Sequence, residues 1–280
     1  MNKMYFFDLD GTLVPFGSDI ASSKTIKVLE KIKNEKDIII YVTGRSPARC
    51  KIEILKYADY FVCCGGTIIV DNHKKTIIKQ NSISEDGFYE LYNLLDNKTA
   101  FSYLTLNEDK VLDKSEQKFL KLQIKHEIRE YPKNVNCEEM IRDLKGNKIL
   151  SFTIFTDSKD RYLDYEFKNL EVYNSLYYGI DLFEKGSNKG DTVKYFKKMY
   201  PNYTILAFGD SDNDVPMIKE ADIGVATGNG SINIKNNANF VTHSVDKDGV
   251  SFFIENMIFD DFESTVIFDN KMIELNKFRR

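Results

Sequence analysis

The stretch YFFDLDGTL, residues 5–13, puts two acidic side chains directly after an apolar run. Its first three residues predict a buried strand, and Asp8 and Asp10 follow it two positions apart. Because residues i and i+2 of a strand point to the same side, the two carboxylates are aimed into one space. Like charges this close raise each other's pKa, and burial raises it further. The arrangement therefore requires a compensating positive charge at the end of this strand.

The composition is that of an ordinary globular protein. Hydrophobic residues make up 42% and charged residues 29% of the 280 residues, and 39 basic against 43 acidic residues give a net charge of −4. This argues against a nucleic-acid partner, because no basic excess is present to neutralise phosphates. No apolar run approaches the roughly 18 residues of a membrane span, and the start MNKMYFF lacks the apolar core of a signal peptide. We expect a cytoplasmic protein without a membrane partner, a monomer or a weak dimer.

The cysteines and histidines suggest no site of their own. Cys63 and Cys64 are adjacent, which makes a poor disulfide framework, and the spacing of the four cysteines matches no zinc pattern. Cys63 and Cys64 lie in an apolar run, so we expect their thiols to be buried and inert. No role is predicted for any of the three histidines.

Strands and helices alternate along residues 4–80 and again along residues 190–258. The run IIIYV at 38–42 has no polar alternation, which is typical of a strand buried on both faces of a parallel sheet. Ser46 and Pro47 predict the start of a helix. Strands separated by helices indicate a doubly wound, mostly parallel α/β sheet of the Rossmann-like kind. The predicted elements are strands at 4–9, 38–42, 60–64, 203–209, 223–226 and 239–242, a hairpin at 67–79, and helices at 22–34, 190–200, 215–221, 231–237 and 249–258.

Residues 82–185 have a different texture and predict an inserted α+β cap domain on a core formed by residues 1–81 and 186–280. The cap strands are amphipathic, which suits a sheet open on one face, and linkers are expected near 80–83 and 184–188. The aromatic stretch 173–179 is expected in the cap core rather than as a stacking platform, and the tail 259–280 has no predicted role. The predicted cap elements are helices at 84–96 and 158–168, a polar helical stretch up to about 144, strands at 101–106 and 148–156, and a hairpin at 170–184.

Polar residues mark four points of the predicted core: Asp8–Thr12, Thr43–Arg45, Lys189 and Gly209–Asp214. In an open α/β sheet the ligand lies beyond the carboxyl ends of the strands, at the switch point. Carboxylates that converge there from separate strands need a cation, and hard oxygen ligands select Mg²⁺ or Ca²⁺. So few protein ligands leave room for water and a substrate phosphate, which is typical of Mg²⁺.

The same residues suit phosphoryl transfer. Thr43, Lys189 and the amides of glycine turns can hold a phosphoryl group. An aspartate beside the phosphorus atom can attack it and form an aspartyl phosphate. A second aspartate can protonate the leaving alkoxide and later deprotonate the attacking water. For the Arg45 side chain the sequence leaves two alternatives: it faces the cap, or it is solvated.

The order DLDGTL (8–13), TGR (43–45), Lys189 and GDSDND (209–214) is similar to that of the haloacid dehalogenase (HAD) superfamily. The insertion resembles that of its Cof-type sugar-phosphate phosphatases, and VDKDGVSFFIE (245–255) is similar to the family's close. One departure is Cys64-Gly65-Gly66, where relatives often carry Asn-Gly, and it could alter substrate contacts.

The resemblance implies a role for each matched residue. Asp8 would be the nucleophile and Asp10 the general acid/base. The metal ligands would be Asp8, Asp10 through its carbonyl, and Asp210, with Asp214 supporting the metal from outside its ligand sphere. The predicted phosphate contacts are Leu9, Thr43, Gly44, Lys189 and Asn213.

We therefore predict a Mg²⁺-dependent phosphatase that hydrolyses small phosphorylated metabolites, a sugar phosphate or similar phosphomonoester, through an aspartyl phosphate on Asp8. A phosphomutase on the same core is the nearest alternative, and it would show no net phosphate release. A phospho-accepting signalling receiver also pairs acids with a threonine and a lysine, but it is far shorter and has no inserted domain. The complete set of acids, hydroxyl and lysine argues against a catalytically idle binding protein.

Overall fold

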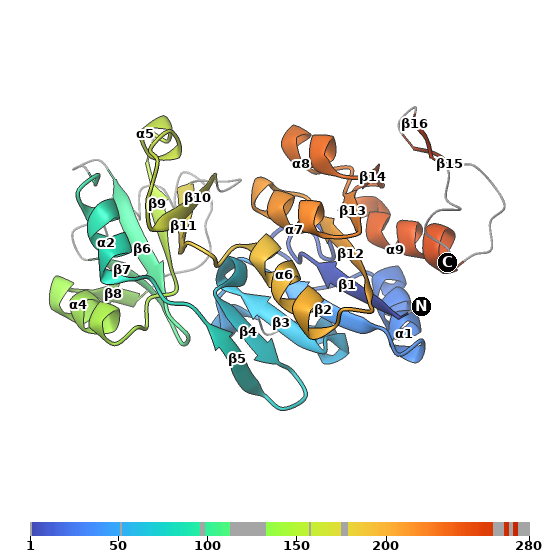
Figure 1. Cartoon of the computed structure of the whole chain (residues 1–280), viewed down its shortest axis with the longest axis horizontal. Coiled ribbons are helices and arrows are strands. Elements are labelled where there is room, and N and C mark those ends of the chain that lie inside the picture. The colour runs from blue at the N-terminus through green and yellow to red at the C-terminus, as the bar shows by residue number, and fades with distance from the viewer. Residues whose placement is uncertain are drawn as a thin grey trace.

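The described residues form two large sheets, each with its own helices, and one separate two-stranded sheet (Figure 1). The computed structural model describes residues 2–50, 52–95, 99–112, 133–156, 158–174, 179–259, 266–268 and 271–273. The larger sheet, on the right of Figure 1, contains strands from both ends of the sequence, and the smaller sheet on the left comes from its middle.

The larger sheet has eight strands in the order β14-β13-β12-β1-β2-β3-β4-β5. β1 is central and pairs in parallel with β12 and β2, and the parallel pairing continues to β14 and β3. β4 is antiparallel to both β3 and β5, so the predicted hairpin is confirmed. The bounds are Lys3–Phe7 (β1), Ile38–Val42 (β2), Tyr60–Cys63 (β3), Ile68–Asp71 (β4), Thr76–Gln80 (β5), Thr204–Gly209 (β12), Ile223–Ala226 (β13) and Phe240–Val241 (β14).

Helices cover both faces of this sheet. Leu29 of α1 and Phe253 of α9 are buried against one face, whereas Phe196, Met217 and Ile234 of α6, α7 and α8 are buried against the other. The predicted doubly wound α/β core is therefore confirmed. The helices are α1 (Ser23–Asn34), α6 (Lys189–Met199), α7 (Val215–Glu220), α8 (Ile232–Asn237) and α9 (Gly249–Ile254).

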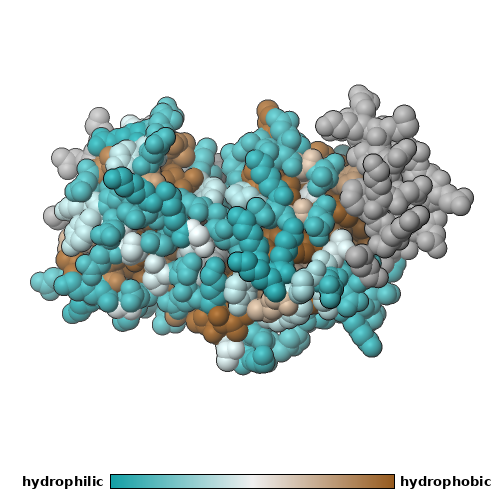
Figure 2. All heavy atoms as spheres, viewed as in Figure 1, coloured by the Kyte–Doolittle hydropathy of each residue, from teal (hydrophilic) through white to brown (hydrophobic). Residues whose placement is uncertain are grey.

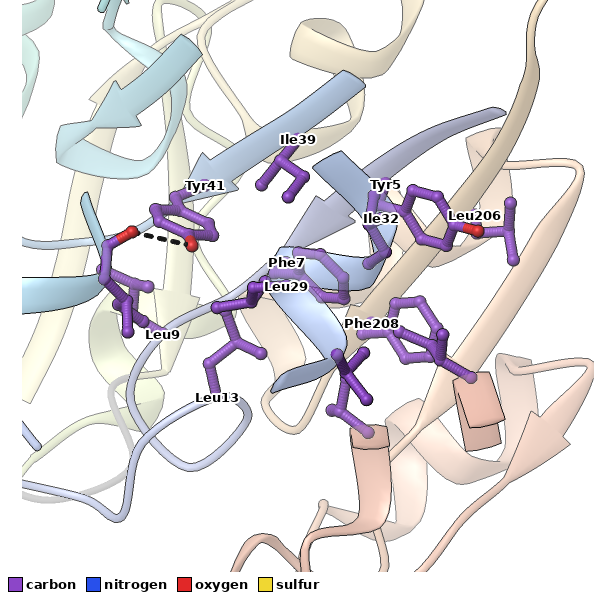
Figure 3. Close-up of a cluster of buried hydrophobic side chains, with 14 of the residues drawn as sticks. Tyr5, Phe7, Leu9, Leu13, Leu29, Ile32, Ile39, Tyr41, Leu206 and Phe208 are labelled. Carbon is purple, nitrogen blue, oxygen red and sulfur yellow. Dashed lines mark hydrogen bonds between the residues drawn. The ribbon is translucent and has the colours of Figure 1, made fainter. Parts of the chain in front are cut away.

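Strand β1 is buried on both faces. Tyr5 and Phe7 point into the hydrophobic cluster of Figure 3, while Met4 and Phe6 contact the opposite face. The ring of Phe7 stacks on that of Phe208 in β12, with centroids 5.1 Å apart. Burial of one such side chain contributes about 1.5–3 kcal/mol. The apolar run thus anchors the strand end that carries the first acidic residue.

The smaller sheet has six strands in the order β10-β11-β9-β6-β7-β8. Phe101, Phe152 and Leu182 of one face pack with α2 and α4, which lie on the side away from the larger sheet (Figure 1). The alternate residues point to the opposite face, so the predicted α+β cap is present. The elements are β6 (Ala100–Leu104), β7 (Asp109–Leu112), β8 (Lys133–Val135), β9 (Ser151–Phe155), β10 (Leu170–Asn174), β11 (Gly179–Glu184), α2 (Glu85–Tyr92), α4 (Cys137–Lys145) and α5 (Asp160–Leu163).

Three predicted helices are wrong in extent, and one of them, predicted at 84–96, already ends at Tyr92. After Ser46 the chain forms two short 3₁₀ turns, Pro47–Arg49 and Glu53–Tyr57, in place of one helix. Ile52 separates them because its backbone is extended (φ −108°, ψ 149°) and its side chain is buried in the core. The helix predicted at 158–168 is a single turn, α5, after which Phe167 is buried in the cap core.

The polar stretch expected to be helical up to about residue 144 contains the strands β7 and β8 before α4. Lys110 of β7 is buried because its Nζ lies 2.7 Å from Asp143 and 2.8 Å from Glu139, both on α4. Such pairing allows a charged residue in a buried strand. Because Lys110 is charged, the sequence pattern did not predict a strand here. Residues 113–132 of this stretch and 175–178 of the aromatic stretch lie outside the described residues. In the tail, Val266–Phe268 (β15) pairs with Lys271–Ile273 (β16).

The two crossings between the larger and smaller sheets lie next to each other. Asn81 Nδ2 is 2.9 Å from Ser187 Oγ and 3.3 Å from the Gly186 carbonyl oxygen. Domain limits at 81/82 and 185/186 remain a prediction. The molecular face in Figure 2 is mostly hydrophilic, with a brown area at its lower edge over β5, where Ile77 is 45% exposed. Among the helices of the described ranges, none combines the length and the apolar character that crossing a bilayer requires.

Candidate active site

The carboxyl ends of β1 and β12 lie side by side. Phe7 pairs with Phe208, and Asp8 and Asp210 directly follow the two strands. The chain continues from β1 to β2 on one side and from β12 to β13 on the other, so this is the topological switch point of the sheet. Ligand atoms of Asp8, Asp210 and Asp214 lie within 4.8 Å of one another here.

Lys189 reaches this cluster from the first residue of α6. The side chain of Asn188 caps the helix by accepting a hydrogen bond from the Asp191 amide. The Lys189 side chain is 2% exposed, its Nζ lies 2.7 Å from Asp8 Oδ1, and it also donates to Asp214 Oδ1. Burial alone would lower the pKa of Lys189, but the two carboxylates hold it above its ordinary value. The ammonium is therefore a fixed positive charge.

Asp214 is fully buried and uses both carboxylate oxygens. Oδ1 accepts from Lys189, and Oδ2 accepts from the amides of Asp210 and Ser211 at 3.1 and 3.0 Å. The Ser211 hydroxyl lies 3.0 Å from the same Oδ2. Asp214 thus fixes the loop after β12 and ties it to α6.

The site carries more negative than positive charge. Burial raises the pKa of Asp8 to about 7; Lys189 opposes this shift and Asp214 adds to it. Burial, with the charges of Asp8 and Asp214, raises the pKa of Asp210 to about 9. One ammonium faces three carboxylates, so a cation would relieve the excess, and an all-oxygen donor set fits Mg²⁺. Asp8 and Asp210 could hold it, since the hydrogen bonds of Asp214 engage both of its oxygens.

Gly11 permits the close approach of the two strand ends. Its φ is +84°, and a Cβ at this position would lie 2.4 Å from Asp210 Oδ2. The neighbouring Thr12 directs its hydroxyl to Asp210 Oδ1 at 3.4 Å. Any side chain at residue 11 would displace the Asp210 carboxylate.

Asp10 directs its carboxylate to Arg45. Arg45 Nε lies 2.8 Å from Asp10 Oδ2 and Nη2 lies 2.6 Å from Oδ1. Arg45 also contacts Asp19 and the Ser18 carbonyl, and its side chain is 13% exposed. Of the two alternatives that the sequence left open for Arg45, the solvated one is wrong, because its guanidinium is engaged by Asp10, Asp19 and the Ser18 carbonyl.

The remaining predicted residues surround the acids. Within the described ranges the amides of Leu9, Asp10 and Gly44 donate no hydrogen bond, so they are free to receive an anion. The side chain of Leu9 is buried in the core and leaves only its backbone available. Thr43 is buried at the end of β2, and its hydroxyl accepts from the Arg45 amide at 3.1 Å. The Ser211 hydroxyl lies 2.7 Å from Asn213 Oδ1.

The cap supplies residues that the sequence analysis missed. Glu171 Oε2 of β10 accepts a hydrogen bond from Asn188 Nδ2 at 2.7 Å. Asn188 directly precedes Lys189 in the chain. The ring of Phe183 in β11 packs on Gly65, where a Cβ would lie 2.6 Å from Phe183 Cζ. Alternation in LEVYN could have identified Glu171, because it lies on the face opposite Leu170 and Val172. No such signal marks Phe183, which directly follows the buried Leu182.

A family model of haloacid dehalogenase-like hydrolases matches residues 5–254 of this chain. The chain belongs to this family. The matched range contains every residue of the site and the whole of the smaller sheet. The predicted superfamily and the prediction of a hydrolase are confirmed.

Similar proteins are known among curated sequences and solved structures. The 5-amino-6-(5-phospho-D-ribitylamino)uracil phosphatase YcsE of Bacillus subtilis is 25% identical over 263 residues, 91% of this chain and 96% of that protein. The pyridoxal phosphate phosphatase YbhA of Escherichia coli is 23% identical over 268 residues, 90% and 97% of the two chains. The HAD subclass IIB sugar phosphatase BT4131 superposes with a TM-score of 0.78 at 22% identity and covers 91% of this chain and 98% of its own. That likeness shows the fold.

Proposed function

We propose that the protein is a Mg²⁺-dependent phosphatase that hydrolyses phosphomonoesters of small metabolites through an aspartyl phosphate on Asp8. The observation that carries this proposal is the Asp8 carboxylate at the end of β1, with Lys189 Nζ 2.7 Å away and Asp210 at its side. The named activities of YcsE and YbhA, both phosphatases of small phosphorylated molecules, support the same reaction class.

Asp8 and Asp10 carry the two halves of the reaction. A carboxylate oxygen of Asp8 attacks phosphorus, and the bond from phosphorus to the ester oxygen breaks. Asp10 gives its proton to the leaving alkoxide and then takes one from water, which attacks the aspartyl phosphate and releases inorganic phosphate. Arg45 donates to both oxygens of Asp10, which orients Asp10 as a carboxylate; one of these two bonds has to open when Asp10 carries the proton.

The phosphoryl group is held by donors around Asp8. The unengaged amides of Leu9, Asp10 and Gly44 point to an anion site, and charged donors such as Lys189 bind phosphate oxygens more strongly than neutral ones. Thr43 and Asn213 complete the set from the ends of β2 and β12. Because these donors contact only phosphoryl oxygens, they recognise any phosphomonoester.

Asp8, Asp210 and the Asp10 carbonyl would hold Mg²⁺. The bound ion would supply positive charge next to the phosphoryl oxygens and reduce repulsion between them and the Asp8 carboxylate. Asp214 binds no metal in this scheme; its hydrogen bonds to Lys189 and to the amides of Asp210 and Ser211 keep both partners in place.

Phosphate release from a panel of phosphorylated sugars, nucleotides and cofactors tests the proposal, with Mg²⁺ and with excess EDTA. We expect Mg²⁺-dependent release by the wild-type chain and none by Asp8→Asn, and mass spectrometry of rapidly denatured protein should detect phosphate on Asp8. Release that persists in EDTA would contradict the metal assignment. Isomerised phosphoester without net phosphate release would identify a mutase instead.

A further inference from the structure

The open face of the smaller sheet carries a row of polar side chains at one level. The strand registers place Tyr173 opposite Asp181, Asp181 opposite Thr153, and Thr153 opposite Ser102. Directly opposed residues on one face of an antiparallel pair have Cβ atoms about 5 Å apart. The four residues therefore form a continuous polar strip across β10, β11, β9 and β6.

Neighbours of Asp181 on the same face reach the active site from two directions. Phe183, two residues further along β11, packs on Gly65, whose amide donates to the Thr43 carbonyl at 3.0 Å. On the other side, Tyr173 donates to Glu171, which binds Asn188 immediately before Lys189 in the chain.

Strand β10 also lies against Asp212–Asp214 in the loop after β12. Lys189 is near enough to lower the pKa of Asp181, which burial raises to about 6. The polar strip thus faces the cluster of carboxylates from the cap side.

The Asp181 carboxylate is only partly satisfied. The Thr153 hydroxyl donates to Oδ1 at 2.9 Å. In the part of the chain that the structure describes, no donor bonds to Oδ2 and Asp181 forms no ion pair. Because Oδ2 is not one of the buried oxygens that lack a partner, it is open to solvent and can accept hydrogen bonds from a ligand that donates them.

We propose that Asp181 and Thr153 bind hydroxyl groups of the leaving alcohol and are the residues that select hydroxylated over apolar phosphate esters. The inference rests on the proposed phosphatase function. Since the phosphoryl donors are on the core, the alcohol must extend toward the cap. There the carboxylate can accept from substrate hydroxyls. The hydroxyl oxygens of Thr153, Ser102 and Tyr173 can accept as well, because their protons are donated to Asp181, the Thr153 carbonyl and Glu171. A cationic alcohol is disfavoured because Lys159 and Lys189 already place positive charge near Asp181.

The test compares kcat/KM for sorbitol 6-phosphate and hexyl phosphate, primary esters of equal carbon number that differ in hydroxyl groups. We expect the wild-type chain to prefer sorbitol 6-phosphate. In Asp181→Asn the ratio of the two values should fall roughly ten- to a hundredfold, the usual effect of losing a hydrogen bond to a charged group. Asp164→Asn, an exposed cap aspartate at the end of α5, is the matched control and should leave the ratio unchanged.

Thr153→Val keeps the Asp181 carboxylate but removes its hydrogen bond, and we expect the ratio to fall severalfold. If Asp181→Asn does not fold, the ratio in Thr153→Val tests the inference. An unchanged ratio in a folded Asp181→Asn or Thr153→Val chain would overturn the inference and leave the phosphatase proposal intact. So would a wild-type preference for hexyl phosphate or for 6-aminohexyl phosphate. A wild-type chain that releases phosphate from none of these esters, nor from p-nitrophenyl phosphate, would overturn both.

Discussion

Arg45 donates hydrogen bonds to both carboxylate oxygens of Asp10, with Nε 2.8 Å from Oδ2 and Nη2 2.6 Å from Oδ1. The pair joins the loop after β2 to the loop after β1, so it couples two strand ends of the site. A planar guanidinium matches a carboxylate through two parallel hydrogen bonds, which a lysine ammonium cannot reproduce. The orientation of the proposed general acid therefore depends on an arginine at residue 45.

Arg45→Lys should lower kcat about ten- to a hundredfold and change KM less, because it misplaces the acid without removing a phosphate contact. Steady-state kinetics on one good substrate would measure both constants. Arg142→Lys, an exposed arginine of α4, is the control. Wild-type kcat in Arg45→Lys would show that Asp10 does not need this orientation.

Asp8→Asn should lose turnover by a factor of about 10³ or more, because the amide is not a nucleophile toward phosphorus. Its circular dichroism spectrum should match that of the wild-type chain, since the side chains are nearly equal in shape. A rate above a tenth of wild type in Mg²⁺-replete buffer would remove Asp8 from the nucleophile's role.

Asp214→Asn should destabilise the fold by about 3–5 kcal/mol, the usual cost of breaking a buried ion pair on one side. The new amide would place a donor against either Lys189 or the amides of Asp210 and Ser211. Urea unfolding measures the change in free energy. Asp246→Asn, at an exposed position, should stay within about 0.5 kcal/mol of wild type; an equally small effect in Asp214→Asn would mean that its bonds are not structurally important.

The sequence was sufficient for the core and for the location of the site because both follow from local patterns. Apolar runs without alternation mark buried parallel strands, and acids directly after such runs must gather at one sheet edge. Asp8 and Asp210 were found in this way, although 202 residues separate them in the numbering of the chain. Element boundaries in the core shift by only a residue or two.

Contacts between distant side chains were beyond the reach of these patterns. The partner of Arg45 lies 35 residues away, and that of Glu171 lies 17 residues away. Lys110 is buried in a strand only because α4 supplies two acids to it. From the sequence alone, each of these charged residues predicts a solvated surface. Its partner comes from a separate element, so only the packing of the elements shows that the residue is paired.

The metal-free protein should lose stability as pH rises. In the folded chain the pKa of Asp8 is raised from 3.8 to about 7 and that of Asp210 from 3.8 to about 9. Between the unfolded pKa of 3.8 and the folded pKa of each group, the folded form therefore binds more protons than the unfolded form. The stabilising contribution of the two groups is complete below the unfolded pKa and is lost as pH rises through the folded values.

Thermal unfolding in EDTA should therefore give a lower Tm near pH 9 than near pH 5. Added Mg²⁺ should raise Tm more at the higher pH, because deprotonated carboxylates bind the ion and binding stabilises the folded form. Asp210→Asn should show a shallower pH dependence and a smaller Mg²⁺ effect. Equal Mg²⁺ effects at both pH values in the wild-type chain would argue against an ion held by these carboxylates.

Removal of the predicted cap, residues 82–185, should separate catalysis from substrate choice. The ends to be joined are adjacent, since Asn81 lies 2.9 Å from Ser187, so a short flexible linker can close the gap. The deletion uncovers Cys50, Cys64 and Ile68, which pack against cap residue Leu150, and we expect a folded but less stable core.

This core should still hydrolyse p-nitrophenyl phosphate, because Asp8 and Asp210 directly follow strands of the larger sheet and Lys189 opens a helix packed on it. It should lose the preference for sorbitol 6-phosphate over hexyl phosphate, because Asp181 and Thr153 are removed with the cap strands. Circular dichroism verifies the fold, and kcat/KM for the three esters, with the full-length chain assayed in parallel, measures the separation. If a folded core kept the full-length ratio, the groups that select the alcohol would have to lie on the core, among the residues that also bind the phosphoryl group.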